Sequence, residues 1–388
     1  MAEAELRDCL YQTNWKKAPQ KVPPLKPLSL LNTPRRIRLF PPFRDSPSPT
    51  FTSPSLTPRL PCTFRLPEIT RRSVLPLLPV QSMCQLPAWP SHLRNADHAI
   101  RISTFSHLSQ IGRRRQELKP QNQDRVLILS PIPGCPKAHL FAVFDGHGEE
   151  GHLVSQYLKE AVAEKVTTLL AALPSAPVSV LVVKLTAVFA QLQNELCDAE
   201  FNVELSGSTA VLVLIIDDLL LCANVGDSRA ILIRKERYWK VKSLTRDHKP
   251  GVESEDCRIS QHQGVVRAIC DPVQGPVGPL RVFAPNQAYP GLAMSRSIGD
   301  EIAHRFGVTA EPEISIHPLS NQDRAVVLAS DGLFDCVRNE EVLAAVKRLE
   351  GRRDAEQCCK QLVRLATSRW EEISKNVDDI STVVVYFK

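Results

Sequence analysis

Proline and glycine are distributed so unevenly that only part of this chain can build a hydrogen-bonded core. Of the 31 prolines, 17 precede residue 91, and the first glycine in the 388-residue chain is Gly112. Proline lacks a backbone N–H donor and interrupts helices and central strands alike. We therefore predict a disordered or weakly ordered extension over residues 1–95 and a folded domain over residues 96–388.

The predicted extension is also the basic part of the chain. Residues 1–90 hold 13 Lys and Arg against 5 Asp and Glu, whereas the whole chain has a formal net charge of +6. The excess charge therefore does not indicate a nucleic-acid-binding face on the folded domain. Repeated Ser-Pro and Thr-Pro pairs fit a docking or phosphorylation tail, and they fit equally an extension with no role in catalysis. An Arg- and Ser-rich organelle transit peptide is a third interpretation.

The cysteines and the apolar runs bear on the cellular compartment. The 11 cysteines form no CxxC pair, and the start MAEAELRDCL lacks the apolar core of a secretory signal. We therefore expect reduced thiols in a cytoplasmic or nuclear protein, with organelle targeting by the extension left open. Acidic residues interrupt the longest apolar runs, such as TAVLVLIIDDLLLCA, so we expect no membrane association.

The spacing of apolar residues beyond residue 96 predicts an α+β domain, because runs of short strands are followed by paired helices. We expect strands at residues 125–130, 138–145, 208–217, 219–226, 229–235, 324–331 and 380–388. We expect helices at residues 151–173, 176–196, 252–264, 339–351 and 354–375. The stretch GPVGPLRVFAPNQAYPG, residues 275–291, is expected to be a long irregular segment.

Four carboxylates share one arrangement, in which an apolar strand carries an aspartate at its end or start. Rigid strand ends can converge on one point, and clustered carboxylates repel one another unless a cation neutralises them. Oxygen ligands of this kind suit Mg²⁺ or Mn²⁺, and the missing Cys/His spacing argues against zinc. Each motif alone also fits an ordinary turn, as does GDSR at residues 226–229. The four residues are Asp124, Asp145, Asp331 and Asp378.

The ordered set of motifs resembles the metal-dependent Ser/Thr protein phosphatases of type 2C, over roughly residues 96–388. The matching stretches are KPQNQD, FAVFDGHG, SGSTAVLVLI, CANVGDSRAIL, LTRDHKP, PGLAMSRSIGD, VVLASDGLFD and DDISTVVV. The resemblance implies a four-layer α-β-β-α sandwich, two antiparallel sheets flanked by helices, with the metal centre at one end. It also implies that the segment before PGLAMSRSIGD is a flap beside the substrate groove.

The resemblance further implies a set of metal ligands. Asp145 should bridge two Mg²⁺ or Mn²⁺ ions, and the Gly146 carbonyl should bind one of them. In the DDIS motif the first aspartate takes the ligand position, which favours Asp378 over Asp379. A third, weaker ion could be held by Asp227 and Asp335 with Asp331. The expected ligands of the two main ions are Asp145, Gly146, Asp331, Asp378 and Asp124.

The expected catalytic and phosphate-binding residues surround these ligands. His147 takes the position of a general acid, because a departing serine alkoxide needs a proton; alternatively it only hydrogen-bonds a neighbouring carboxylate. Lys119 stands where the family has a phosphate-binding arginine, and it lacks the bidentate fork of arginine. Arg115, with its two preceding arginines, could substitute, or the triplet could be a solvated basic turn. Gln123 replaces an acidic residue common in the family.

The mechanism implied by the resemblance needs no phosphoenzyme. Two ions lower the pKa of a bridging water, and the resulting hydroxide attacks phosphorus in line. Phosphorylated proteins would be the substrates of a monomeric enzyme. The sequence also allows two alternatives: a pseudophosphatase that acts as a binding or scaffold module, and an enzyme for small phosphorylated metabolites.

Overall fold

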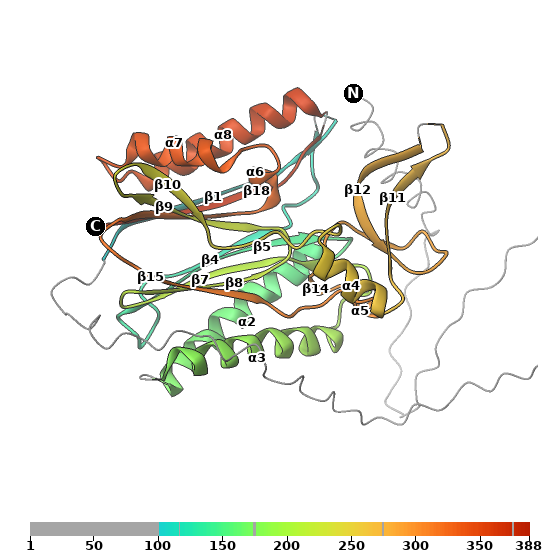
Figure 1. Cartoon of the computed structure of the whole chain (residues 1–388), viewed down its shortest axis with the longest axis horizontal. Coiled ribbons are helices and arrows are strands. Elements are labelled where there is room, and N and C mark those ends of the chain that lie inside the picture. Colours follow the sequence, from blue (N-terminus) through green and yellow to red (C-terminus); the bar gives the residue numbers. More distant parts are fainter. Residues whose placement is uncertain (1–100, 116, 174–175, 274, 375) are drawn as a thin grey trace, which may run out of the picture. The chain divides into compact units, whose positions relative to one another are not determined.

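The computed structural model describes residues 101–388 apart from residues 116, 174–175, 274 and 375. The predicted disordered extension, residues 1–95, and its boundary with the folded domain lie outside the described residues. Within the described part, two antiparallel sheets lie face to face, and paired helices cover the outer face of each sheet (Figure 1).

The first sheet has the strand order β1-β18-β16-β9-β10 and is antiparallel throughout. The sequence pattern does not reveal β1, whose polar stretch ISTFSHLSQ forms an edge of this sheet against the fully buried β18. Helices α7 and α8 pack on the outer face, with the short α6 after β16. The strands are β1 (Ile102–Gln110), β18 (Ile380–Phe387), β16 (Asp323–Ala329), β9 (Arg229–Lys235) and β10 (Trp239–Ser243). The helices are α6 (Asp331–Phe334), α7 (Asn339–Leu349) and α8 (Ala355–Ile373).

The second sheet has the order β14-β6-β5-β7-β8-β15, and β4 pairs with the other edge of β5. Helices α2 (Gly151–Ala172) and α3 (Val178–Cys197) cover its outer face. The strands are β4 (Asp124–Leu129), β5 (Ala138–His147), β6 (Gly207–Ser208), β7 (Ala210–Ile216), β8 (Leu219–Val225), β14 (Ile298–Gly299) and β15 (Glu313–Pro318).

The sandwich has one core between the two sheets and one beneath each pair of helices. Successive side chains of a strand point to opposite faces, so a continuous apolar strand contributes to two of these cores. In β18, Val383 and Val385 point between the two sheets, whereas Val384 and Tyr386 pack beneath α7 and α8. The period of two is the geometry of any strand whose two faces are both buried. In β5, Phe141 likewise belongs to the core between the sheets. The predicted four-layer α-β-β-α sandwich is therefore confirmed.

A smaller lobe built on a three-stranded sheet corrects one expectation. The prediction of an irregular segment over residues 275–291 is wrong, because most of it forms strands. β12 (Gly275–Phe283) pairs antiparallel with β11 (Val265–Asp271), and its end also pairs with β13 (Pro290–Leu292). The lobe also contains the helices α4 (Glu253–Gln261) and α5 (Glu301–His304).

The prolines of β12 are tolerated because half of the strand lies at an edge. Proline cannot donate to a ladder, so it is normally excluded from central strands. β13 pairs only with Val282 and Phe283 of β12. Pro276 therefore lies where β12 has a partner on one side only, and Pro279 lies within the register shift of the β11–β12 pair, where the ladder is interrupted. Composition alone does not reveal this half-edge strand.

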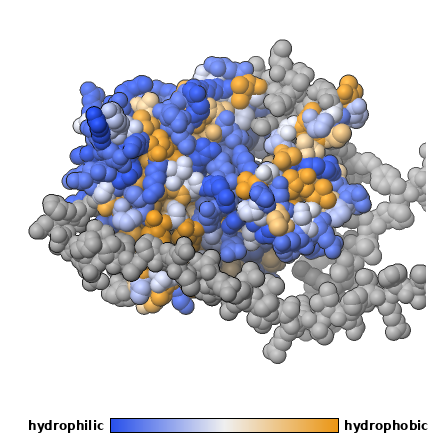
Figure 2. Space-filling view, viewed as in Figure 1, coloured by the Kyte–Doolittle hydropathy of each residue, from blue (hydrophilic) through white to orange (hydrophobic). Residues whose placement is uncertain are grey.

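The apolar composition of α3 is explained by its packing, and the apolar residues at the surface are dispersed. By length and composition α3 could cross a membrane, but its apolar face packs into the core through Leu185, Phe189 and Leu192. The face shown in Figure 2 is mostly hydrophilic, with apolar residues in separate patches. Val273, at the tip of the β11–β12 hairpin, is the most exposed large apolar side chain among the described residues, at 92%.

Candidate metal centre

Asp124 and Asp145 lie directly opposite each other on neighbouring strands. They are cross-strand partners at the start of β4 and near the end of β5. The Ser330 hydroxyl donates to Asp124 Oδ2 at 2.8 Å, while Asp124 Oδ1 is buried without a hydrogen-bond partner among the described residues. A buried carboxylate oxygen left without a donor is a candidate cation ligand.

Asp331 and Asp378 reach the same end of the sandwich from the other sheet. Asp331 begins α6 directly after β16, and Asp378 precedes β18. β16 and β18 are neighbours, with Ala329 paired to Thr382, so their ends lie side by side. Four strand-end carboxylates from two sheets thus share one neighbourhood, as the sequence predicts.

The electrostatics of these carboxylates show how close they are. Burial, followed by the charges of Asp124, Asp331 and Asp378, holds the pKa of Asp145 well above its usual range. Burial and the nearby Asp379 raise the pKa of Asp124 to about 7. Such mutual repulsion at neutral pH is what a bound divalent cation would relieve.

The four carboxylates suit cations in their chemistry, although their side chains are not yet arranged as a complete coordination shell. Among residues 101–388, apart from the five positions that the structure does not describe, no three His, Cys, Asp or Glu side chains already stand in metal-ligating geometry. All-oxygen donors and the absence of a nearby thiol ligand suit Mg²⁺ or Mn²⁺. These residues therefore fit the ions implied by the motif set.

Glycine is required at position 146 because backbone segments meet there. A Cβ atom on Gly146 would lie 2.3 Å from the Gly151 carbonyl oxygen and 2.7 Å from that of Gln123. The Gly146 N–H donates to the Gln123 carbonyl at 3.2 Å. The Asp-Gly-His-Gly stretch is therefore a close crossing of three chain segments, which fixes the backbone directly after Asp145.

The two aspartates of the DDIS motif have different partners. Asp379 is buried and accepts from the backbone N–H groups of Gly112 (2.7 Å) and Gln123 (3.0 Å). Its oxygens are therefore used to hold the chain around Asp124 in place. The Asp378 side chain is 43% exposed and adds to the charge that Asp145 experiences. This difference supports Asp378 as the ligand of the pair.

Lys119 lies among the carboxylates. Its ammonium is 2.5 Å from Asp378 Oδ1 and 3.4 Å from Asp379 Oδ2. Burial alone would lower the pKa of Lys119, but the charges of Asp378 and Asp379 outweigh burial and raise it. The residue that replaces the expected arginine is therefore a permanent cation at the edge of the metal centre.

The arginine triplet lies on a small sheet beside Asp378. β2 (Arg113–Arg114) pairs with β3 (Glu117–Leu118) and with β17 (Asn376–Val377), which directly precedes Asp378. The N–H of Arg115 donates to the Asn376 side chain at 3.2 Å. The structure thus brings Arg115 to the same edge as Lys119, which keeps it a candidate phosphate ligand.

A histidine–aspartate pair adds a residue that sequence reasoning missed. His147 Nε2 lies 2.6 Å from Asp300 Oδ2, although 153 positions separate the residues. Burial would lower the pKa of His147, but the Asp300 charge and this hydrogen bond raise it. A Cβ atom on Gly207 would lie 2.2 Å from Asp300 Oδ2 and 2.9 Å from His147 Nε2, so only glycine fits beside the pair.

The predicted third ion position is lined by Asp227, Asp335 and a lysine. Asp227 Oδ1 is buried without a hydrogen-bond partner among the described residues. The Lys249 ammonium lies 3.5 Å from Asp227 Oδ2 and 3.2 Å from Asp335 Oδ1. Burial, followed by the charges of Asp335 and Asp227, raises the pKa of Asp331 well above its usual range. Asp331 therefore lies close to both of these carboxylates.

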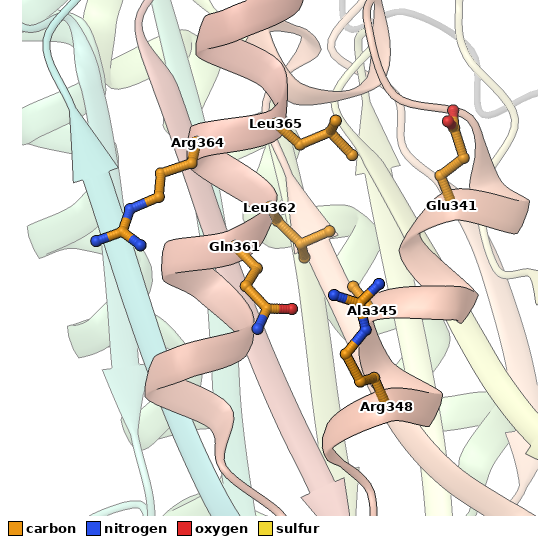
Figure 3. Close-up of a pocket in the computed structure, with 7 residues that line it drawn as sticks. All are labelled: Glu341, Ala345, Arg348, Gln361, Leu362, Arg364 and Leu365. Atoms are coloured by element: carbon orange, nitrogen blue, oxygen red, sulfur yellow. The ribbon is translucent and has the colours of Figure 1, made fainter.

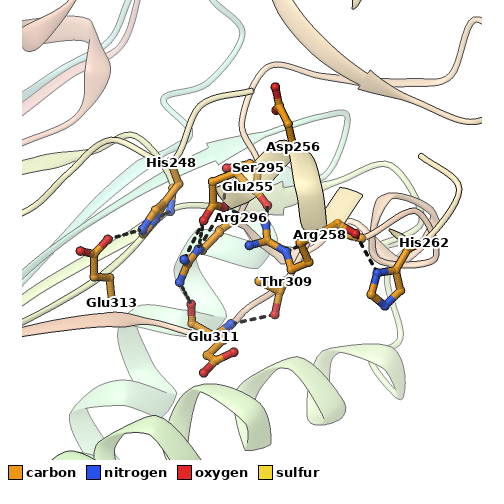
Figure 4. A network of polar contacts seen from close by, with 12 residues as sticks. His248, Glu255, Asp256, Arg258, His262, Ser295, Arg296, Thr309, Glu311 and Glu313 are labelled. Carbon is orange, nitrogen blue, oxygen red and sulfur yellow. Dashed lines mark hydrogen bonds and ion pairs between the residues drawn. The ribbon is translucent and has the colours of Figure 1, made fainter. Parts of the chain in front are cut away.

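A buried ion network ties the small lobe to the loop that carries Asp300 (Figure 4). Glu255 of α4 accepts hydrogen bonds from Arg296, Arg258 and Ser295. Ser295 and Arg296 belong to the motif SRSIGD that ends at Asp300. The arginines of the network thus hold in place the loop that supplies the partner of His147.

His248 connects this network to the turn before Asp227. The Gly226 N–H donates to His248 Nδ1 at 3.1 Å, and His248 Nε2 lies 3.2 Å from Glu313 Oε2. Burial, followed by the charge of Arg296, lowers the pKa of His248 to about 4. A neutral ring is therefore part of the native structure, because a protonated Nδ1 could no longer accept from Gly226.

We expect His248 to make the fold acid-sensitive. Its pKa is about 4 in the fold against 6.5 for the free side chain, so its contribution is complete above pH 6.5 and is lost as the pH falls towards 4. The difference amounts to roughly 3 kcal/mol. Urea unfolding of His248→Gln, which keeps an acceptor and a donor, should show a flatter decline than wild type over this range. His262→Gln, at an exposed position, is the control and should follow wild type.

A cavity between the C-terminal helices lies away from the candidate metal centre (Figure 3). It has a volume of about 270 Å³ between α7 and α8. None of its lining residues is a predicted site residue. They are Glu341, Ala345, Arg348, Gln361, Leu362, Arg364 and Leu365.

Comparison with known proteins agrees with the geometry. The family model described as protein phosphatase 2C matches residues 111–372. The chain is 33% identical over 303 residues to probable protein phosphatase 2C 35 of Arabidopsis thaliana, covering 73% of this chain and 84% of the relative. It is 34% identical over 283 residues to probable protein phosphatase 2C 72 of the same plant, covering 70% and 83%.

Solved structures show the same fold. A serine-threonine phosphatase 2C from Toxoplasma gondii superimposes with a TM-score of 0.63 at 19% identity, covering 75% of this chain and 98% of that one. A C. elegans sex determining protein gives 0.58 at 24% identity, covering 73% and 64%. The family match, the similar relatives and the clustered strand-end carboxylates together identify the chain as a member of the protein phosphatase 2C family, the metal-dependent Ser/Thr protein phosphatases.

Proposed function

We propose that the protein hydrolyses phosphoserine and phosphothreonine in proteins with two Mg²⁺ or Mn²⁺ ions held by Asp145, Gly146, Asp331, Asp378 and Asp124. The observation that carries the proposal is the placement of Asp124, Asp145 and Asp331 at one end of the sandwich, where Asp124 and Asp145 are cross-strand partners. Burial and neighbouring carboxylates raise the pKa of all three. Buried carboxylates that destabilise one another at neutral pH are an arrangement that divalent cations stabilise.

The proposal assigns a role to the metal ligands, to His147 and to Asp300. When bound, the cations would supply activated solvent and offset the charge on the phosphoryl oxygens. His147 would donate a proton from its ring to the departing serine or threonine oxygen, with Asp300 orienting the ring through the 2.6 Å contact at Nε2. That contact occupies Nε2, so Nδ1, which has no hydrogen-bond partner among the described residues, would be the nitrogen that donates to the leaving group.

Lys119 and Arg115 are the proposed phosphate ligands. Lys119 is bound to Asp378 and Asp379, and we propose that its ammonium turns to the phosphoryl oxygens once cations neutralise these carboxylates. As a point charge it attracts phosphate without fixing its orientation. Arg115 offers the planar fork that Lys119 lacks.

The test is hydrolysis of phosphoserine and phosphothreonine peptides by the full chain. We expect release of phosphate with MnCl₂ and none after EDTA, with activity restored by excess Mn²⁺. Faster hydrolysis of small phosphorylated metabolites than of peptides would instead favour the metabolite alternative. Mn²⁺ binding without hydrolysis of any substrate would favour the pseudophosphatase.

A further inference from the structure

We propose that Lys249 is an internal counter-cation that occupies the position of a third metal ion, so that the chain itself neutralises Asp227 and Asp335. The inference concerns the same centre as the proposed function and rests on it. The observation behind it is that the ammonium of Lys249 lies between two carboxylates, 3.5 Å from Asp227 Oδ2 and 3.2 Å from Asp335 Oδ1.

The chain holds Lys249 in this place through both of its preceding residues. Arg229 binds Asp247 through Nε (3.0 Å) and Nη2 (2.7 Å). His248 is held by Gly226 through its backbone N–H and its ring, and its carbonyl accepts from Ser295. The segment that delivers Lys249 is therefore fixed at two successive positions, which makes the lysine's approach a property of the fold.

The carboxylates it faces need a positive charge. The Asp227 side chain is 5% exposed, and its Oδ1 has no hydrogen-bond partner among the described residues. Asp331 also contributes to the electrostatic field at Lys249. A buried carboxylate with an unsatisfied oxygen is costly unless a cation lies near it.

An ammonium and a divalent ion cannot share this place at low cost. Both would be drawn to the same two carboxylates, Asp227 and Asp335, and positive charges a few ångströms apart repel strongly at a partly buried site. The Lys249 side chain is 37% exposed, so it can swing towards solvent when an ion enters. A third ion must therefore displace the lysine, which weakens its binding relative to the two main ions.

The experiment counts bound Mn²⁺ by electron paramagnetic resonance of the free ion, on the full chain. Lys249→Met removes the charge and keeps the length of the stem, and we expect the affinity for a third ion to rise at least about tenfold. Lys249→Arg keeps the charge and should behave as wild type. Lys347→Met, at an exposed position of α7, controls for the loss of a lysine elsewhere.

Two further variants complete the test. Adding Asp227→Asn to Lys249→Met should abolish the gain, and Lys249→Gln replaces Lys249→Met if the latter fails to fold by circular dichroism. Wild-type Mn²⁺ binding in both neutral variants would overturn the inference, as would a raised KM with unchanged Mn²⁺ binding, which would make Lys249 a substrate ligand. If wild type fails to hydrolyse phosphopeptides, the proposed function is wrong. The Mn²⁺ binding measured by electron paramagnetic resonance still decides the role of Lys249.

Discussion

Asp145→Asn is expected to lower kcat on phosphopeptides by about a thousandfold, which corresponds to about 4 kcal/mol of transition-state stabilisation. Asp145 faces Asp124 across the strand pair and experiences the charges of Asp331 and Asp378. A neutral amide oxygen at this position is a weaker ligand for divalent ions. Steady-state assays over a range of Mn²⁺ concentrations would measure the loss.

The same variant should be more stable than wild type without metal. The raised pKa of Asp145 means that its charge destabilises the fold above the pKa of the unfolded chain, and this penalty grows as the pH rises towards the folded pKa. We therefore expect Asp145→Asn to melt higher than wild type in EDTA at pH 7, and to lose most of the Mn²⁺-induced rise.

Asp217→Asn is the matched control for Asp145→Asn. Its carboxylate is 52% exposed in the β7–β8 turn and pairs with Lys137 at the surface. Neither kcat nor the effect of Mn²⁺ on the melting temperature should change. If Asp145→Asn melted lower than wild type in EDTA and kept its Mn²⁺ response, Asp145 would not be a metal ligand.

His147→Asn should reduce kcat on phosphoserine peptides by about 10²- to 10⁴-fold, the usual range for a lost general acid. The loss should be much smaller with p-nitrophenyl phosphate, because its leaving group departs without a proton. Asp300→Asn should give an intermediate loss with the same dependence on the leaving group, since it alters the partner that orients the ring.

The comparison between the two substrates separates chemistry from folding. A variant that merely loses stability would lose activity equally on both, and His262→Gln should be unaffected on both. Equal losses for His147→Asn on the peptide and on p-nitrophenyl phosphate would contradict proton donation by His147.

The layered fold could be predicted because its strands are buried on both faces. Runs such as TAVLVLII and STVVVYF are unambiguous, since few other elements accept continuous β-branched residues. β1 could not be recognised, because its polar residues reflect an edge position that only the pairing with β18 reveals. β12 could not be recognised either, because its prolines are tolerated only at an edge position that the strand pairing reveals.

The candidate site likewise has residues that local sequence signals predict and contacts that only the tertiary structure reveals. Strand-end aspartates and their family positions are local signals, and all four lie at one end of the sandwich. The contact between His147 and Asp300 depends on packing between residues 153 positions apart. The position of Lys249 among the carboxylates is equally non-local. The motifs RSIGD and DHKP mark these residues in the sequence without saying what they touch.

Ser330 has a consequence for how fast cations can bind. Its hydroxyl donates to Asp124 on one sheet and accepts from the N–H of Ser381 on the other. This bridge joins the two halves of the carboxylate cluster within the protein itself, so no closure of one sheet on the other has to precede ion entry. Loading then requires only side-chain rearrangement and the shedding of water by the incoming ion, so we expect Mn²⁺ to enter faster than the reluctantly dehydrating Mg²⁺, which stopped-flow mixing would measure.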